Sequence, residues 1–158
     1  MYKRALVALD GSPVAESIIP FILDIAGPLD LEVILLRVLP PLQPMVIEGA
    51  AYVPIEDPAA ERTDAQEYLA PVAIELRNKG VRVTTEVRSG DPGREILVAA
   101  RDAGADLIAM STHGRGGLGR LLFGSVAEAV LRETKIPVLL MRTTEEEMAR
   151  RGRREAVR

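Results

Sequence analysis

Five apolar runs alternate along this chain of 158 residues with longer stretches whose apolar residues recur at helical spacing. Short runs rich in Val, Ile and Leu are typical of strands that are buried on both faces of a parallel sheet. Strands that alternate with helices indicate an α/β fold with right-handed crossovers. The predicted strands are 4–9, 31–38, 81–87, 106–110 and 136–141.

Capping residues and prolines predict where the helices begin and end. Ser12 followed by Pro13 is a common helix start, and the apolar pattern continues to about Ala26, where residues 27–28 predict the end. Pro20 predicts a kink inside this helix. Further helices are expected at 59–78, 91–104 and 124–134.

Two segments depart from this alternation. Residues 40–58 contain five prolines and have no sustained hydrophobic period. They are predicted to form a mobile, irregular loop that acts as a lid. Residues 143–158 contain glutamates followed by arginines, and are predicted to be a charged tail. Residues 1–142 are therefore expected to form one domain.

Composition excludes several classes of protein. The hydrophobic fraction of 47% excludes a disordered chain, and the absence of cysteine excludes disulfides and thiolate metal sites. A net charge of −3 and an aromatic fraction of 3% argue against a nucleic-acid surface. The apolar run that ends before Asp10 is too short for a signal peptide, and no segment is long enough to span a membrane. A cytoplasmic location is expected.

The fourth predicted strand leads into a loop rich in glycine and arginine. Gly114, Arg115 and Gly116 stand at the start of this loop, and Gly124 with Ser125 begins the helix that follows. Backbone N–H groups at a helix N-terminus attract anions, and glycine lets a phosphate approach the backbone. Two such sites, one loop apart, predict the binding of a di- or triphosphate.

The same loop matches two known phosphate motifs only in part. Gly114, Gly116 and Gly119 have the spacing of a dinucleotide fingerprint, but no acidic residue ends the next strand. A P-loop requires Lys after its last glycine, where this chain has Arg120. The structural alternative is a flexible surface turn, although flexibility alone does not require the arginines.

Other polar residues at element ends have both a functional and a structural interpretation. Ser125 suits a phosphate, and with Glu128 three residues on it also fits a capping box. Asp10 ends the first strand, where it is either a ribose ligand or a turn residue. Asp91 is interpreted as a helix cap only. His113 is the single histidine, and without a nucleophile elbow it is expected to contact phosphate rather than act as a base.

Residues 111–125 read Ser-Thr-His-Gly, nine further residues, and then Gly-Ser. This resembles the Gly-x-x-Gly, nine residues, Gly-(Ser/Thr) motif of ATP-binding members of the universal stress protein family, with Ser111 in place of the first glycine. The opening Val-Ala-Leu-Asp-Gly-Ser at 7–12 and the Ile-Leu-Leu-Arg-Val at 34–38 are also similar to that family. The resemblance covers the chain up to about Arg142.

The resemblance implies a flavodoxin-like, doubly wound sheet of five parallel strands in the order 3-2-1-4-5, with helices on both faces. It implies that ATP, accompanied by Mg²⁺, binds at the carboxyl ends of the first and fourth strands. The implied nucleotide contacts are Ala8, Leu9, Asp10, Val38, Met110, Ser111, His113, Gly114, Arg115, Gly116, Gly124, Ser125 and Val126. No catalytic residue and no metal ligand is assigned.

The expected function is that of a cytoplasmic, ATP-binding stress-response protein. Its expected role is nucleotide-dependent regulation and not rapid turnover of a substrate. Two alternatives remain. One is a stress protein that binds no nucleotide and works through contacts with a protein partner. The other is a slow ATPase or a nucleotidyl-transfer enzyme.

The last predicted strand also carries an expectation about assembly. Residues 136–141 are apolar at every position, and by the family's strand order they lie at the sheet edge. A long apolar edge invites pairing, and Pro137 is tolerated near the start of such a strand. A homodimer joined through 136–142 is therefore expected. The alternative is that the tail after Thr143 covers this edge.

Overall fold

The computed structural model of the chain describes residues 1–41, 45–47, 50–52, 57–113 and 124–143. Five strands form one parallel sheet in the order β5-β2-β1-β6-β7. In chain order this is 3-2-1-4-5, so the predicted flavodoxin-like fold is confirmed. The strands are β1 (Arg4–Leu9), β2 (Glu32–Leu39), β5 (Arg82–Ser89), β6 (Leu107–His113) and β7 (Val138–Thr143).

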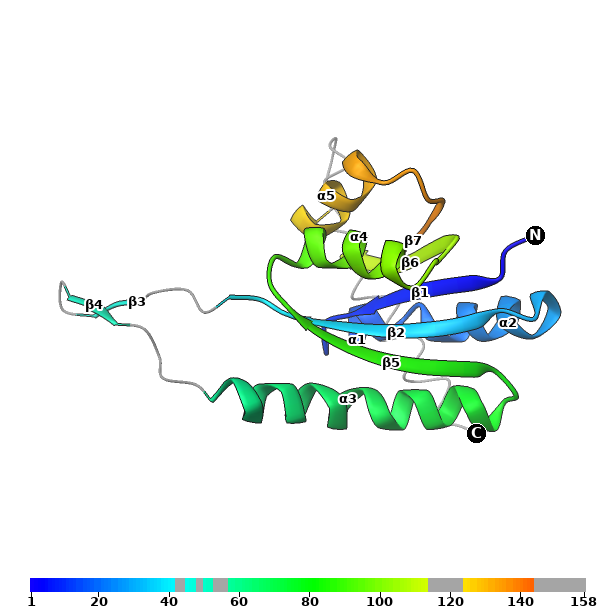
Figure 1. Ribbon diagram of the computed structural model, residues 1–158, viewed down its shortest axis with the longest axis horizontal. Coiled ribbons are helices and arrows are strands. Elements are labelled where there is room, and N and C mark those ends of the chain that lie inside the picture. Colours follow the sequence, from blue (N-terminus) through cyan, green and yellow to red (C-terminus); the bar gives the residue numbers. More distant parts are fainter. Residues whose placement is uncertain (42–44, 48–49, 53–56, 114–123, 144–158) are drawn as a thin grey trace.

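Helices cover both faces of the sheet (Figure 1). Alternate residues of each strand face opposite sides, so Val7 and Leu35 pack with one set of helices, and Leu6 and Leu36 with the other. The first set is α1 (Pro13–Glu16), α2 (Ile19–Leu29) and α3 (Pro58–Asn78); the second is α4 (Pro92–Asp102) and α5 (Ser125–Glu133). The aliphatic core is thus divided by the sheet into two layers.

The predicted helix from Pro13 to about Ala26 is in fact two helices, so the expected kink is wrong. Pro20 is the second residue of α2 and lacks the N–H that would continue the helix from α1, and the chain breaks between the two instead. The predicted end at 27–28 is also wrong. The helix ends at Leu29, because Asp30 adopts φ 50° there and the N–H of Leu31 returns to Ala26 O at 2.9 Å.

Part of the 40–58 segment is regular, which corrects the expectation of an irregular loop. Strands β3 (Met45–Ile47) and β4 (Ala50–Tyr52) pair antiparallel, away from the five-stranded sheet (Figure 1). Three-residue strands with valine, isoleucine and tyrosine suit local pairing but are too short to show a period in sequence. The side chains of this hairpin lie outside the described residues, so the lid remains a prediction.

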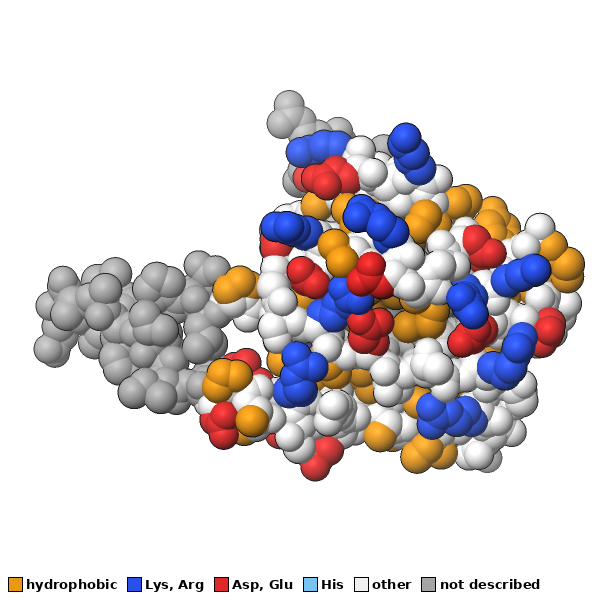
Figure 2. Space-filling model, viewed as in Figure 1, with side chains coloured by type: hydrophobic (Ala, Val, Ile, Leu, Met, Phe, Trp, Pro, Cys, Tyr) orange, Lys and Arg blue, Asp and Glu red, His pale blue; other side chains and the backbone are white. Residues whose placement is uncertain are grey.

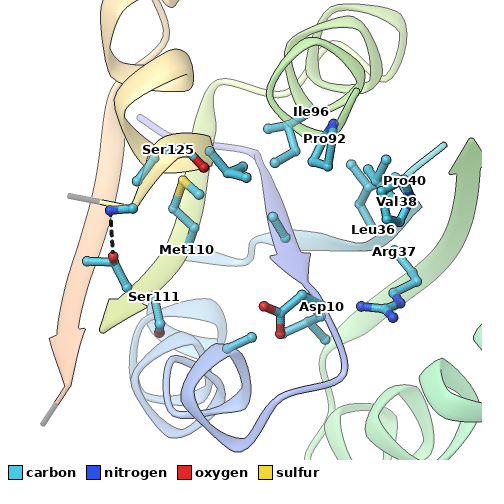
Figure 3. A pocket seen from close by; sticks show the side chains of 17 residues that line it. Asp10, Leu36, Arg37, Val38, Pro40, Pro92, Ile96, Met110, Ser111 and Ser125 are labelled. Carbon is cyan, nitrogen blue, oxygen red and sulfur yellow. Dashed lines mark hydrogen bonds between the residues drawn. The ribbon is translucent and has the colours of Figure 1, made fainter. Parts of the chain in front are cut away.

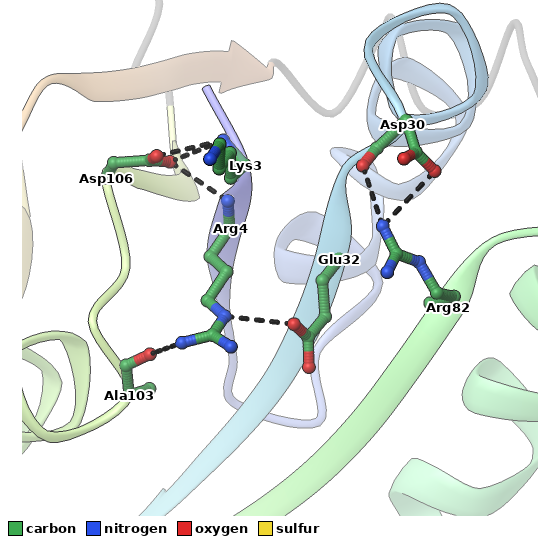
Figure 4. Close-up of polar contacts among 7 residues, drawn as sticks. All are labelled: Lys3, Arg4, Asp30, Glu32, Arg82, Ala103 and Asp106. Carbon is green, nitrogen blue, oxygen red and sulfur yellow. Dashed lines mark hydrogen bonds and ion pairs between the residues drawn. The ribbon is translucent and has the colours of Figure 1, made fainter. Parts of the chain in front are cut away.

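The chain itself pairs the polar groups at the amino ends of the central strands (Figure 4). The Asp106 carboxylate accepts hydrogen bonds from Lys3 N, at 2.9 and 3.1 Å, and from Arg4 N at 3.0 Å. Arg4 Nε donates to Glu32 Oε2 at 2.9 Å and Arg4 Nη1 donates to Ala103 O at 3.0 Å. This end of the sheet is therefore closed by hydrogen bonds within the chain.

Charged side chains of both signs are interspersed on the face of the molecule that Figure 2 shows. Arg88 of β5 pairs with three acidic side chains, with its guanidinium 2.5 Å from Glu86, 2.7 Å from Asp102 and 3.7 Å from Glu95. The hydrogen bond that Arg88 donates to Asp102 is the largest of the influences that raise the pKa of Arg88. Through Glu95 and Asp102, which lie on α4, Arg88 connects β5 with that helix.

Candidate functional site

A pocket of about 400 Å³ opens at the carboxyl ends of β1, β2 and β6 (Figure 3). The starts of α4 and α5 close its other side. Carboxyl ends of strands are where open α/β sheets bind ligands. Nine of the residues expected at the nucleotide line this pocket: Ala8, Leu9, Asp10, Val38, Met110, Ser111, Gly124, Ser125 and Val126.

The other four expected residues cannot be placed at the pocket. His113 is the last residue of β6, and its side chain lies outside the described part of the structure. Gly114, Arg115 and Gly116 also lie outside the described residues. Their expected contacts with phosphate therefore stay predictions.

The start of α5 forms one side of the pocket. Gly124 is the N-cap residue, and its N–H donates to Thr112 Oγ1 at 3.1 Å. Ser125 is the first helical residue, one position too late to cap, so the predicted capping box with Glu128 is wrong. The Glu128 N–H bonds to the Gly124 carbonyl at 2.9 Å instead. The Ser125 hydroxyl has no hydrogen bond to the described residues and lines the pocket (Figure 3).

The end of β1 forms the opposite side, where the chain makes a sharp turn. Gly11 has φ +85°, which side-chain-bearing residues rarely adopt, and it directs the chain into α1. Asp10 Oδ1 accepts from Ser12 N at 2.8 Å, so the predicted turn role is present. The Asp10 Oδ2 atom has no hydrogen bond to the described residues. The carboxylate can therefore hold the turn and still accept a bond from a ligand.

Ser111 replaces a motif glycine, and its hydroxyl takes part in a hydrogen-bond network at the edge of the pocket. Its Oγ accepts from Ser17 Oγ at 3.2 Å, and Ser17 Oγ lies 2.8 Å from Thr143 Oγ1. Figure 3 shows the Ser111 side chain on the α1 side, away from Ser125. The extra hydroxyl thus connects α1, β6 and β7 and leaves open the space beside the start of α5.

An apolar wall completes the pocket, and sequence reasoning missed most of it. Leu36 lies two residues before Val38 and on the same side of β2, so the period of a strand could have identified it. Asp91 caps α4 as predicted, accepting from Arg94 N at 2.9 Å, and so fixes the first turn that carries the other wall residues. The pocket residues that were not predicted are Ala15, Leu36, Arg37, Pro40, Pro92, Ile96, Thr112 and Ala127.

A close helix contact positions the two helix starts beside each other. A Cβ on Gly93 of α4 would lie only 2.8 Å from the Ala129 Cβ of α5. Any larger side chain would separate these helices, because real Cβ atoms do not approach so closely. Glycine at this position therefore brings the first turn of α4 near that of α5, and both turns line the pocket.

Arg37 is the cationic side chain among the described residues that line the pocket. Its guanidinium lies over the ring of Tyr68 on α3, 5.8 Å from the ring centroid. Burial first, and the Glu16 carboxylate second, raise the pKa of Tyr68 well above its usual value. The ring is therefore neutral at physiological pH, and no phenolate competes for Arg37.

The described residues hold no group of three or more His, Asp or Glu side chains suited to a metal ion. A magnesium ion at this pocket would have to be bound with help from the phosphates of a ligand. Within the same described residues, no helix is long and apolar enough to cross a membrane.

The model of the universal stress protein family matches residues 1–142. The chain belongs to this family. The universal stress protein MJ0531 of Methanocaldococcus jannaschii is 34% identical over 149 residues, which cover 93% of this chain and 86% of that protein. The solved structure of MJ0577, also from M. jannaschii, is 28% identical with a TM-score of 0.69, and the match covers 90% of this chain and 97% of that one.

Some solved structures with the same fold contain adenine nucleotides. A universal stress protein from Archaeoglobus fulgidus was solved in complex with dAMP; it is 20% identical with a TM-score of 0.65, and the match covers 88% of this chain and 97% of that one. A universal stress protein solved in complex with cAMP is 20% identical with a TM-score of 0.64. An Arabidopsis thaliana protein of the family, solved with AMP bound, is 18% identical with a TM-score of 0.62. At these identities the likeness to this chain is one of fold.

Proposed function

We propose that this universal stress protein binds ATP in the pocket at the carboxyl ends of β1 and β6, and acts as a nucleotide-dependent regulator in the stress response. The observation that carries the proposal is the convergence of Asp10 and the Gly124–Ser125 helix start on one pocket with an apolar wall. Adenine nucleotides in structures of the same fold support it.

The pocket's chemistry suits the three parts of an adenine nucleotide. Phosphates would lie at the start of α5, because N–H groups there have no partner within the helix. The base would lie against Val38 and Met110 on the apolar wall. Ribose hydroxyls would donate to Asp10 Oδ2, between the other two parts. Mg²⁺ would accompany the triphosphate, held by its oxygens and water.

Calorimetric titration of nucleotide-free protein with ATP and AMP, each with and without Mg²⁺, tests this function. We expect saturable heat with one site per chain for at least one of these nucleotides, and tighter binding of ATP when Mg²⁺ is present. An absence of heat in all four titrations would favour the alternative of a stress protein that works by protein contacts alone.

We further propose that ATP hydrolysis is slow, because the described residues provide no paired acid and base. A rate below about one turnover per minute is expected, against a median of about 10 per second for enzymes. Fast hydrolysis that is lost in His113→Ala would instead support the enzymatic alternative.

The proposed assembly is a cytoplasmic homodimer that pairs through the edge strand β7. Leu139 and Leu140 are only partly buried within one chain, and β7 lies at the end of the strand order. Light scattering at micromolar concentration is expected to give a dimer mass, and the double variant Leu139→Asp with Leu140→Asp a monomer mass. A monomer mass for the unmodified chain would contradict the dimer.

A further inference from the structure

Arg37 is a partly buried cation for which the described residues provide no anionic partner. It has no ion pair and no hydrogen bond with them, whereas Arg88, also partly buried, pairs with three carboxylates. Removing charge from water without a partner is costly. The unpaired guanidinium at the pocket is therefore suited to an anionic group of a ligand.

The Arg37 side chain is also held in place before any ligand arrives. A Cβ built on Gly11 would lie 3.6 Å from Cζ, Nη1 and Nη2 alike, so the guanidinium lies flat against this glycine. The Tyr68 ring lies 5.8 Å away on α3. Both neighbours position the cation without neutralising it. A side chain that is already positioned loses less conformational entropy when an anion binds.

The position of Arg37 determines which phosphate of a bound nucleotide it could contact. In Figure 3, Arg37 lies near Asp10 and across the pocket from Ser125. The 5′-phosphates would lie at Ser125, so they would be distant from Arg37. In dinucleotide-binding folds, an arginine near the acidic residue that binds ribose accommodates a phosphate on the ribose. The guanidinium can bind such a phosphate through two parallel N–H···O bonds.

We propose that Arg37 recognises a phosphate on the 2′ or 3′ oxygen of the ribose, so that the pocket favours adenosine bisphosphates over AMP. Asp10 would accept a bond from the ribose hydroxyl that remains free. This inference rests on the proposed function, because it assumes that an adenine nucleotide occupies the pocket.

Calorimetry with four nucleotides tests the inference: AMP, ADP, adenosine 2′,5′-bisphosphate and adenosine 3′,5′-bisphosphate. ADP carries as many phosphates as the bisphosphates but has both on the 5′ side, so it controls for the number of phosphates. At least one bisphosphate is expected to bind about tenfold tighter than AMP, the effect of one charge-assisted contact. In Arg37→Gln this advantage is expected to disappear, while AMP and ADP affinities change less than about threefold.

Two further variants keep the result interpretable. Arg37→Lys keeps the charge but loses the two-bond geometry, and should retain only part of the advantage. Arg101→Gln removes an exposed charge from the end of α4, outside the pocket lining, and should retain all of it. Thermal melting establishes that each variant is folded.

Each outcome of these titrations tests a separate claim. If AMP and ADP bind but neither bisphosphate binds tighter than AMP, the inference is wrong and the proposed function stands. The same holds if Arg37→Gln weakens all four nucleotides equally. If none of the four binds the unmodified chain, the proposed function fails and the inference fails with it.

Discussion

The two ends of the same five-stranded sheet differ in how their charged side chains are paired. At the amino end, Asp106 accepts from two backbone N–H groups, and Arg4 bonds to Glu32 and to a carbonyl (Figure 4). At the carboxyl end, the Arg37 guanidinium has no hydrogen bond or ion pair with any described residue, although a pocket of about 400 Å³ lies beside it (Figure 3).

This difference in pairing indicates which end of the sheet stabilises the fold and which end can bind a ligand. Hydrogen bonds within the chain at the amino end fix the strands and the connection before β6. Unpaired donors and acceptors at the carboxyl end gain most from a polar ligand, since a partly buried polar group without a partner costs free energy that a ligand can recover. Changes at the amino end should therefore alter stability, and changes at the carboxyl end should alter binding.

The largest expected effect is on nucleotide affinity in Gly124→Val. The branched side chain would lie where phosphate must approach the helix start, and losing two charge-assisted bonds weakens ATP binding by about a hundredfold or more. The fold should tolerate the change, because among the described residues a Cβ at Gly124 would meet only Thr112 Oγ1, at 3.5 Å. Calorimetry measures the affinity.

The matched control for this prediction is Gly27→Val on α2, where a Cβ would meet no atom of the described part of the chain within 4 Å. Gly27 does not line the pocket, so this variant should bind ATP like the unmodified chain. Unchanged affinity in Gly124→Val would show that phosphate does not lie at the start of α5.

The next effect concerns stability, at the amino end. Asp106→Ala removes the acceptor for two backbone N–H groups, that of Lys3, which is shared between both carboxylate oxygens, and that of Arg4. Because these bonds are partly exposed, we expect the free energy of unfolding to fall by about 2 kcal/mol. Urea denaturation measures this value, and ATP affinity should stay within about twofold. A large loss of affinity with intact stability would contradict the division between the two ends.

The smallest effect is expected in Asp10→Ala, which removes the proposed ribose acceptor. One lost charge-assisted bond weakens ATP binding by about tenfold. Asp57→Ala is the matched control, because Asp57 accepts from the N–H two residues on at 2.9 Å, as Asp10 does at 2.8 Å, and lies outside the pocket lining. Equal ATP affinities in the two variants would show that Asp10 serves only the turn.

Local sequence signals predicted the elements whose causes are local. The strand at 4–9 has the predicted bounds, and Ser12 and Asp91 cap the helices that they precede, because a cap needs only neighbours a few residues away. The capping box predicts the N-cap of α5 at Ser125, one residue after the observed cap Gly124, because serine and glycine both occur at N-caps. The family motif, rather than periodicity, provided the strand order and the nucleotide.

Contacts between distant segments could not be predicted in this way. The position of Arg37 depends on a turn 26 residues before it and a helix 31 residues after it, which only the folded sheet brings together. The hydroxyl of Ser111 bonds to Ser17, 94 residues away, so its direction could not be predicted from the motif. Hydrophobic patterns predict which face of a helix or strand is buried. They do not predict which polar side chains of different elements contact each other.

The most direct test of the contrast between the two ends is an amide NMR titration of the ¹⁵N-labelled protein with ATP and Mg²⁺. We expect large shift changes at Ser12, Arg37 and Ser125, at the carboxyl end, and small ones at Lys3, Arg4 and Asp106. Shift changes centred on the amino-end residues, or none at saturating ATP, would contradict the claim that the open end of this sheet is a nucleotide site.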